Sequence, residues 1–318
     1  MADVLFMGTP PFAVASLEAI IKAGHNIVGV VTTPDKQAGR GLKKSSSAVC
    51  IYAKEHQLTL FQPENLNDDV LVCDITALKP DVIVVVAFRK IPKSIYIIPK
   101  YGTFNVHASL LPQYRGAAPI NHAIINGETQ TGITTFLLDD NIDTGKIICR
   151  EKIDIGSNET AGELHDKLMV LGAQSAVKTI DMLLAGDTPT IDQNTLLTGE
   201  SNMVIHKAPK LTKEFCKLNW TKDTMSVYNK IRGLSPYPCA YTEITNAGGN
   251  TLSLKIFSST PTIQQHTHGA GEITCDNINF LGIYTSDGII YLEDVQQAGR
   301  KRMSIKDFLR GTKIMRQD

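Results

Sequence analysis

The sequence is poor in the features that mark secreted, membrane and metal-binding proteins. It holds six cysteines, none of them in a Cys-x-x-Cys pair, which favours free thiols over a disulfide framework or a zinc site. The longest apolar runs, such as VIVVVAF at 82–88, are too short to cross a bilayer. The opening MADVLFMGTP lacks the basic segment and long apolar run of a signal peptide. These absences predict a soluble cytoplasmic protein.

The chain also lacks an excess of charge of either sign. Its 32 basic and 32 acidic residues give a formal net charge of zero, which argues against a basic surface over the whole chain but leaves room for a local one. Hydrophobic residues make up 42% of the 318 residues, which is enough for packed cores. The length favours two domains or one large one.

The N-terminal half alternates between strand and helix patterns. Short, almost continuously apolar runs predict buried strands at 3–8, 25–33, 81–87 and 101–108. Helical spacing predicts helices at 11–24, about 46–56, about 66–78 and 161–186. This alternation is typical of a doubly wound α/β sheet.

The pattern changes after the helix at 161–186. Residues 188–205 are polar and rich in turn formers, which predicts a linker. From 206 the chain holds short strand patterns, and SDGI at 286–289 between two apolar runs predicts a hairpin. The second part is therefore expected to be a small antiparallel barrel.

One stretch, NVHASLLPQYRG at 105–116, combines a strand end with polar chemistry. Because strand residues two apart point the same way, Asn105 and His107 share one face. Ligands of open α/β sheets bind beyond the carboxyl ends of the strands, where this pair lies. An amide and an imidazole could there polarise a carbonyl and move a proton. The alternative is that both side chains only satisfy backbone groups of the loop.

The loop that follows adds backbone and shape constraints. Pro112 restricts the backbone and Gly116 permits close approach, and the apolar and small residues suit a flat heteroaromatic ligand. An ordinary strand-to-helix loop remains the alternative. A later acidic turn, LLDDNIDTGKII, holds Asp139, Asp140 and Asp143. Such a turn is either a solvated cap or the source of a carboxylate that orients a histidine, and spacing does not show whether Asp143 reaches His107.

Two segments are locally basic. Residues 33–47 (TPDKQAGRGLKKSSS) form a long loop around Arg40, and 207–232 holds seven basic residues against two acidic ones. Each segment is either a solvated surface or a site that binds the phosphates of a nucleic acid. Small barrels often bind nucleic acid. The turn GTPPFAV lacks the Gly-x-Gly-x-x-Gly pattern of a nucleotide site. His266 and His268 have no other clustered ligands and are expected to be solvent-exposed, with no metal.

Several motifs together resemble the family of methionyl-tRNA formyltransferases. They occur in order over nearly the whole chain: FMGTPPFAV, VVTTPDKQAGRG, NVHASLLPQYRGAAP, DDNIDTGKII, APKLTKE and QQAGRKRMS. The resemblance implies a Rossmann-like formyltransferase domain at 1–187, a linker at 188–205 and an OB-like tRNA-binding domain at 206–318. It implies a monomer that transfers the formyl group of 10-formyltetrahydrofolate to the α-amino group of initiator methionyl-tRNA, without a metal.

The resemblance also implies roles for particular residues. The catalytic triplet would be Asn105, His107 and Asp143. Folate contacts would come from Ser109, Leu110, Leu111, Pro112, Phe88 and Arg89. Contacts to tRNA would come from Arg40, Lys43, Lys207 and Lys210. Phe88-Arg89 departs from the Tyr-Gly pair common in the family, which puts the local backbone shape and folate contacts in question but not the triplet.

The residues leave other functions open. A formyltransferase acting on a small amine, such as an amino-sugar nucleotide, would use the same chemistry but leave the basic loop and second domain without a role. A non-catalytic RNA-binding protein would not need the triplet. A hydrolase that deformylates folate would release it without an acceptor. In the favoured mechanism Asn105 and His107 stabilise the tetrahedral oxyanion, and Asp143 holds His107 or accepts a proton.

Overall fold

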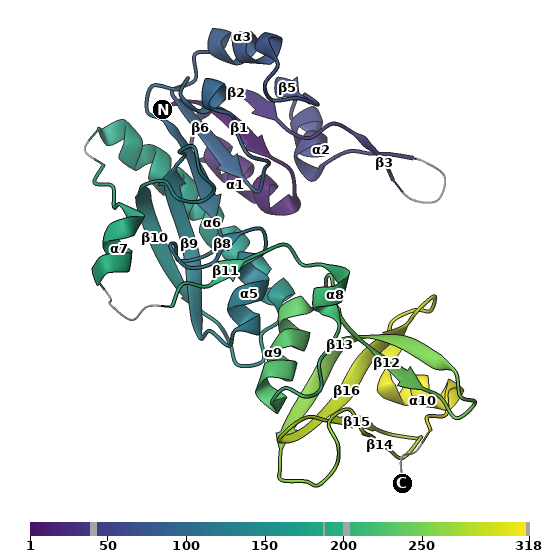
Figure 1. The fold of residues 1–318 in the computed structure, drawn as a ribbon. Helices are drawn as coiled ribbons and strands as arrows, with labels where there is room; N and C mark the ends of the chain where they lie inside the picture. The colour runs from purple at the N-terminus through teal and green to yellow at the C-terminus, as the bar shows by residue number, and fades with distance from the viewer. Residues whose placement is uncertain (39–42, 187, 200–203, 316–318) are drawn as a thin grey trace. The chain divides into compact units, whose positions relative to one another are not determined.

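The computed structural model describes residues 1–38, 43–186, 188–199 and 204–315, and these fold into two compact units (Figure 1). The first unit comprises Met1–Gly116, Thr131–Ile153 and Asp166–Lys207. The second comprises Ala117–Gln130, Asp154–His165 and Ala208–Asp318. Two short segments from the N-terminal half thus belong to the second unit.

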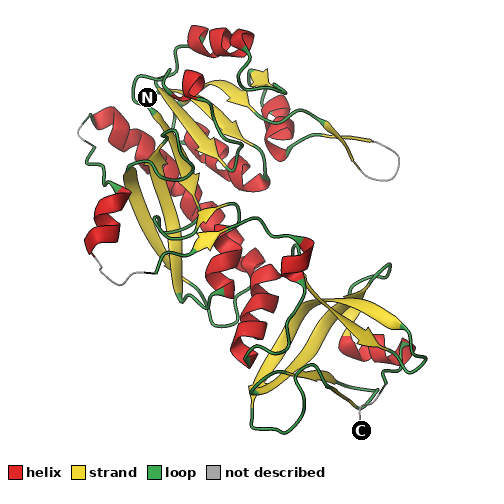
Figure 2. Ribbon diagram, in the orientation of Figure 1, coloured by secondary structure: helices red, strands yellow, loops and turns green. Residues whose placement is uncertain are grey.

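The first unit is built on a seven-stranded sheet with the order β10-β9-β7-β6-β1-β2-β5 (Figure 2). The strands are β1 (Asp3–Gly8), β2 (Asn26–Val31), β5 (Leu60–Phe61), β6 (Val82–Val86), β7 (Thr103–His107), β9 (Gln130–Leu137) and β10 (Ile147–Asp154). β7, β6, β1, β2 and β5 run parallel to one another, and β9 is antiparallel to β7. The predicted α/β sheet is confirmed, with an antiparallel addition at one side.

Helices cover both faces of this sheet. They are α1 (Pro11–Lys22), α2 (Ala48–Glu55), α3 (Asp69–Ala77), α4 (Lys93–Tyr96), α6 (Ala161–Ala185, from Asp166 on) and α7 (Gln193–Gly199). Ser47 caps α2 by accepting a hydrogen bond from the Cys50 N–H at 3.0 Å, and Asp68 caps α3 in the same way. β3 (Lys36–Ala38) and β4 (Lys43–Ser45) form a separate antiparallel pair.

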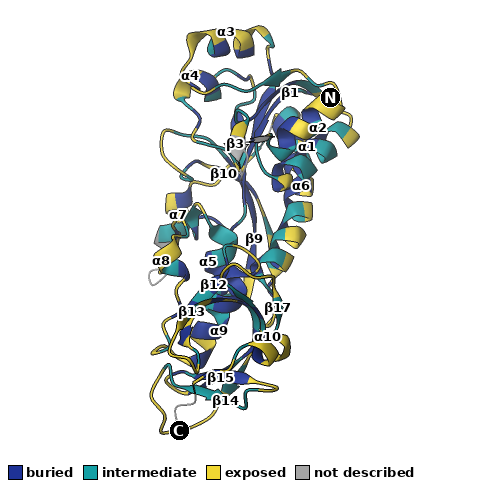
Figure 3. Ribbon diagram, turned by 90° about the vertical axis from the view of Figure 1, so that its right-hand side faces the viewer, coloured by how far each residue is buried: buried dark blue, intermediate teal, exposed yellow. Residues whose placement is uncertain are grey.

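The two faces of the sheet carry alternate residues of each strand. On one face Leu5, Met7, Ile83 and Val85 form an apolar cluster with residues of α3 and α4. On the other face Val106 of β7 lies close to Gly172 of α6. β6 is buried along its whole length, as its VIVVV sequence requires of a strand covered on both sides. The neighbouring strand β1 is buried from Val4 to Gly8 and is drawn dark blue in Figure 3.

Helix α6 is long and apolar enough, by length and composition, to cross a membrane. Its apolar residues nevertheless have a packing role within the first unit, since Leu168, Ala176 and Ile180 are fully buried there. An amphipathic helix whose apolar stripe faces a sheet shows the same composition. Its buried stripe therefore has partners within the fold.

The second unit is a curled antiparallel sheet with the order β12-β13-β16-β15-β14 and β17 paired to β16. Its strands are β12 (Ala240–Thr245), β13 (Thr251–Ile263), β14 (Ile273–Cys275), β15 (Leu281–Tyr284), β16 (Gly288–Gln297) and β17 (Met303–Ser304). The register of β13 on β16 shifts between Ile256 and Ser259, and such bulges bend a long strand. The predicted hairpin at 286–289 joins β15 to β16. This architecture is consistent with the predicted small barrel.

The second unit also contains the helices α5 (Pro119–Ile125), α8 (Lys213–Cys216), α9 (Thr224–Leu234) and α10 (Ile305–Gly311) and the first turn of α6. α5 packs against α9 at Gly233, where a Cβ would lie 2.6 Å from the Ile125 side chain. The Asn121 side chain donates a hydrogen bond to the Gly233 carbonyl at 2.7 Å. Two short strands, β8 (Arg115–Gly116) and β11 (Lys207–Ala208), lie where the chain passes from the first unit to the second.

Candidate active site

The site lies where β6 and β7 end side by side. The register pairs Val86 with both Gly8 and Val106, so the loops after β6 and β7 leave the same edge of the sheet. The loop after β6 holds Phe88 and Arg89, and β7 ends at His107. This is the carboxyl edge where open α/β sheets bind ligands.

Asn105 and His107 lie on the face opposite α6. Their cross-strand partners on β9 are Phe136 and Thr134, and cross-strand partners point to the same side of a sheet. His107 is buried, at 6% exposure, with its ring edge toward Phe136. Asn105 is half-buried, and within the described part of the chain its side chain has no hydrogen-bond partner. Its amide is thus available to a ligand.

The two ring nitrogens of His107 have different partners. Nε2 lies 3.0 Å from the carbonyl oxygen of Tyr114, and Nδ1 lies 4.0 Å from Oδ2 of Asp143. A carbonyl only accepts hydrogen bonds, so Nε2 carries a proton in either charge state of the ring. Nδ1, which faces the carboxylate, is therefore the atom that can gain or lose a proton.

Of the three aspartates in the acidic turn, only Asp143 faces His107. Asp139 accepts hydrogen bonds from the Asn141 N–H and the Thr144 hydroxyl, and so shapes the turn. Asp140 is exposed and accepts a 2.6 Å hydrogen bond from the Tyr96 hydroxyl. That bond lowers the pKa of Asp140 and raises the pKa of Tyr96 to about 12.

Asp143 is held in an uncommon backbone conformation. Its φ is 57°, in the left-handed region, and its Oδ2 accepts a hydrogen bond from the Gly116 N–H at 2.9 Å. Its side chain is only 13% exposed. The carboxylate is thus fixed between the loop that follows His107 and the imidazole itself.

The expected folate residues of the loop after β7 differ in accessibility. Ser109, Leu111 and Pro112 are buried, and Leu110 is half-buried. The Ser109 hydroxyl donates to the Gln113 carbonyl at 2.7 Å, while the Leu111 N–H donates to Thr134. Ser109 and Leu111 therefore set the shape of the loop, and the Leu110 side chain is the more accessible one.

Phe88 and Arg89 lie in the loop after β6, at the same edge of the sheet. Phe88 packs partly buried against the cluster below α3 and α4, and the Arg89 guanidinium lies 5.5 Å from its ring centroid. Arg89 also donates hydrogen bonds to the carbonyls of Pro63 and Glu64, the latter at 2.7 Å. Partial burial lowers the pKa of Arg89. The side chain at this position, where the resemblance implies glycine, thus ties the loop after β6 to the chain at Pro63 and Glu64.

The expected tRNA residues come from two segments of the chain, 33–47 and 207–232. Arg40 lies outside the described residues. Lys43 belongs to β4, and its side chain also lies outside the described part. Lys207 and Lys210 are exposed. Further along the basic segment, Lys230 has its pKa lowered by burial and lies over the Phe215 ring.

The last basic residue of that segment is structural. Arg232 is buried and donates hydrogen bonds to the carbonyls of Gly156 and Glu159. Its burial lowers its pKa. The basic segment therefore divides into an exposed start and a packed end.

Sequence reasoning missed Gln193, which lies in the segment expected to be a linker. It is 1% exposed and hydrogen-bonds to the main chain of Asp143 and to the side chain of Arg115. A single glutamine in a polar stretch carries no pattern that would distinguish it. Its role is visible only because α7 folds back onto the site.

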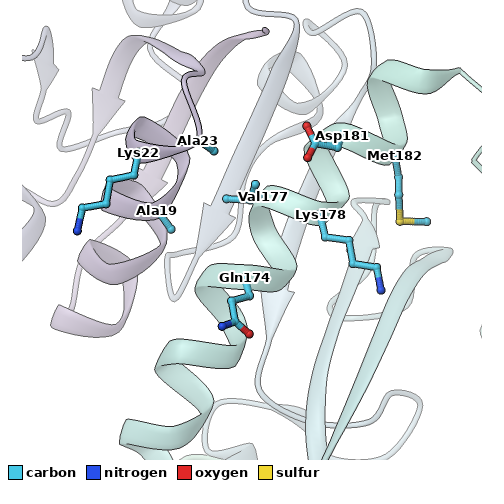
Figure 4. Close-up of a pocket in the computed structure, with 8 residues that line it drawn as sticks. All are labelled: Ala19, Lys22, Ala23, Gln174, Val177, Lys178, Asp181 and Met182. Carbon is cyan, nitrogen blue, oxygen red and sulfur yellow. The ribbon is translucent and has the colours of Figure 1, made fainter.

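A surface pocket lies elsewhere on the first unit, between α1 and α6 (Figure 4). Ala19 of α1 and Ala23, which follows the helix, face Val177 of α6 across it. Lys22 and Lys178 are already paired with Glu18 and Glu151. None of its lining residues belongs to the predicted site. Among the described residues, no group of three or more histidine, cysteine and acidic side chains could hold a metal ion.

Comparisons with known proteins identify the family of this chain. The profile of the family described as formyl transferase matches residues 2–180, and that of the formyl transferase C-terminal domain matches residues 210–313. The methionyl-tRNA formyltransferase of Azobacteroides pseudotrichonymphae is 48% identical, over 98% of this chain and 96% of the relative. That of Bacteroides fragilis is 45% identical, over 97% and 94%.

A solved structure shows the same fold at lower identity. WlaRD, a sugar 3N-formyl transferase solved in the presence of dTDP and 5-N-formyl-THF, is 22% identical with a TM-score of 0.65, over 95% of this chain and 99% of that one. At this identity the likeness concerns the fold. The full-length relatives and both profiles show that this chain is a formyl transferase and belongs to the family of the methionyl-tRNA formyltransferases.

Proposed function

We propose that this enzyme transfers the formyl group of 10-formyltetrahydrofolate to the α-amino group of methionyl initiator tRNA, for translation initiation in the cytoplasm. The observation that carries the proposal is the similarity over nearly the full length, both domains included, to relatives named for that reaction. An acceptor as large as tRNA also gives the second unit and the exposed lysines a role.

In the proposed mechanism Asn105, His107 and Asp143 act on the formyl group and its acceptor. The amine nitrogen attacks the formyl carbon, and the carbonyl oxygen gains negative charge. The amide of Asn105, for which no described residue is a hydrogen-bond partner, and a protonated Nδ1 of His107 are suited to stabilise this oxyanion. As the bond from the formyl carbon to N10 breaks, N10 takes a proton and the amine loses one.

Asp143 has one of two roles in this proposal. Its carboxylate faces Nδ1 of His107 and holds the imidazole in place, or it accepts the proton of the incoming amine. The Gly116 N–H fixes the carboxylate for either role. The chemistry forms no covalent intermediate with the enzyme.

The residues around the sheet edge fit a reduced folate. Phe88 and Leu138 are partly buried apolar residues packed against the same cluster, and Leu110 is half-buried on the neighbouring loop. Such surfaces suit a flat heterocycle, and the polar pair supplies orientation. In this proposal Phe88, Arg89 and Leu110 border the pterin, while Ser109, Leu111 and Pro112 set the shape of the loop that meets it.

For the acceptor, the proposal assigns phosphate contacts to Arg40, Lys43, Lys207 and Lys210, and makes 206–318 a tRNA-binding domain of a monomeric enzyme. Exposed lysines such as Lys207 and Lys210 can neutralise phosphates with little desolvation. The buried Arg232 has structural partners and is not assigned to tRNA.

The test is a formyl-transfer assay with three acceptors: initiator methionyl-tRNA, elongator methionyl-tRNA and a dTDP-linked amino sugar. We expect transfer to the initiator tRNA with a strong preference over the other two. A preference for the amino sugar would overturn the acceptor, leaving the formyl chemistry intact. Release of formate from the donor without any acceptor would instead indicate a deformylase.

A further inference from the structure

The segment at 188–199 is docked beside the active site. Ile191 pairs with Ile147 at the start of β10 through two main-chain hydrogen bonds of 2.8 and 2.9 Å. The Asp192 side chain then accepts a hydrogen bond from the Asn194 N–H, at the start of α7. Figure 1 shows α7 beside β10. Gln193, the first residue of α7, is thereby delivered to the loop that precedes β10.

Apolar packing fixes the same helix. Leu196 of α7 packs against a buried cluster of Leu111, Phe136 and Ile147. Leu111 belongs to the loop after His107, and Phe136 meets the His107 ring edge-on. The position of α7 is thus coupled to the elements that carry the proposed catalytic residues.

Gln193 uses both ends of its side-chain amide. Nε2 donates to the carbonyl of Asp143 at 3.0 Å and to the carbonyl of Gly145 at 2.8 Å. Oε1 accepts from Nε and Nη2 of Arg115, at 3.1 and 2.6 Å. Carbonyls only accept and guanidinium groups only donate, so the amide orientation follows from its partners.

These contacts connect the loop after β7 with the loop between β9 and β10. Gln193 joins the main chain of Asp143 to Arg115, and the next residue, Gly116, donates its N–H to the Asp143 carboxylate. Asp143 sits at a positive φ, which a non-glycine residue keeps only when its surroundings enforce it. At Gly145 a Cβ would collide with the carbonyl of Leu137, so this part of the loop lies tight against β9.

We propose that Gln193 is a positioning residue for formyl transfer, which holds Asp143 against His107 through the Asp143 and Gly145 carbonyls and Arg115. The inference rests on the proposed function. Gln193 is buried and reaches the reaction only through Asp143, so it does not touch substrate. Losing it should displace the carboxylate while leaving the folate and tRNA surfaces in place.

Two variants test the proposal. Gln193→Glu keeps an acceptor for Arg115 but turns an oxygen toward two carbonyls, and Gln193→Met removes both halves of the contact. For each we expect kcat to fall roughly tenfold to a hundredfold, as small misplacements of catalytic groups do, with KM for both substrates within about threefold of the parent. The readout is steady-state formyl transfer to initiator methionyl-tRNA.

Two controls separate positioning from stability and charge. Ile180→Val removes a methyl group from a buried side chain in α6 and so lowers the stability of the same unit. Gln174→Glu adds the same negative charge as Gln193→Glu, but at an exposed position of α6. Both should keep the parent kcat. The proposal would be overturned if Gln193→Glu and Gln193→Met both kept the kcat of the parent enzyme. It would also be overturned if Ile180→Val lowered Tm as much as these variants do and lost as much of its kcat. An inactive parent would overturn the proposed function instead.

Discussion

The Nδ1 atom of His107 lies 4.0 Å from Oδ2 of Asp143, while Nε2 of the same ring faces the Tyr114 carbonyl at 3.0 Å. The imidazole is therefore held from both sides, and only one of its nitrogens faces an acidic group. This arrangement distinguishes Asp143 from Asp139 and Asp140 of the same acidic turn, which contact other groups.

The first prediction compares two of those aspartates. Asp143→Ala should lower kcat/KM for formyl transfer by about a hundredfold or more, because the imidazole loses its facing carboxylate. Asp140→Ala is the matched control, since Asp140 is exposed and bonded to Tyr96. It should retain the parent rate. Equal losses in the two variants would contradict the assignment of Asp143.

The second prediction concerns Arg89, whose guanidinium joins the loop after β6 to the carbonyls of Pro63 and Glu64. Hydrogen bonds to a charged group contribute roughly 1.5–3 kcal/mol, less where solvent screens them, so Arg89→Ala should lower the free energy of unfolding by about 1–2 kcal/mol. Urea denaturation measures this change.

The same variant should raise KM for 10-formyltetrahydrofolate and leave KM for tRNA unchanged, since the altered loop borders the proposed pterin site. Arg89→Lys keeps the charge but not the two-pronged geometry, and should resemble the alanine variant. If both variants bound folate normally, Arg89 would have no part in the folate site.

The third prediction concerns tRNA. Lys207→Ala with Lys210→Ala should raise KM for tRNA without changing KM for folate. Each lost phosphate contact should reduce the slope of log affinity against log salt by about 0.7–0.9. Binding titrations at several salt concentrations measure the slope, with Lys54→Ala in α2 as control. An unchanged slope in the double variant would exclude these lysines from the interface.

The fourth prediction concerns acid stability of the second unit. His122 of α5 donates from Nε2 to the Pro209 carbonyl at 3.0 Å, and burial lowers its pKa below the ordinary value of 6.5. Below pH 6.5 the unfolded chain therefore binds a proton that the folded state resists. Stability should fall as pH decreases below 6.5, by at most about 1.4 kcal/mol per pH unit for this one site.

His122→Gln keeps a donor for Pro209 but does not titrate, so it should flatten this dependence. The single tryptophan, Trp220, lies in the second unit and reports its unfolding by fluorescence. Urea titrations at pH 7.5, 6.5 and 5.5 give the comparison. An equally steep pH dependence in His122→Gln would assign the effect to other groups.

Much of the fold is local in origin, and the sequence predicts it well. The apolar run VIVVV became the buried strand β6, the helical spacing at 161–186 became α6, and the SDGI turn became the β15–β16 hairpin. Strand periodicity also placed Asn105 and His107 on one face of the sheet, at the carboxyl ends of its parallel strands. These features depend on neighbours a few residues away, which is the range over which a hydrophobic pattern is informative.

Tertiary structure decided the rest, because it depends on segments far apart in the chain. Three aspartates share one turn, and only the approach of the loop at 114–116 selects Asp143. Gln193 lies 50 residues from Asp143 and 78 from Arg115, in a stretch whose polar composition predicts a linker. Composition predicts exposure, yet a polar side chain is stable in the interior when each of its donors and acceptors is paired, and only the folded chain brings those partners together.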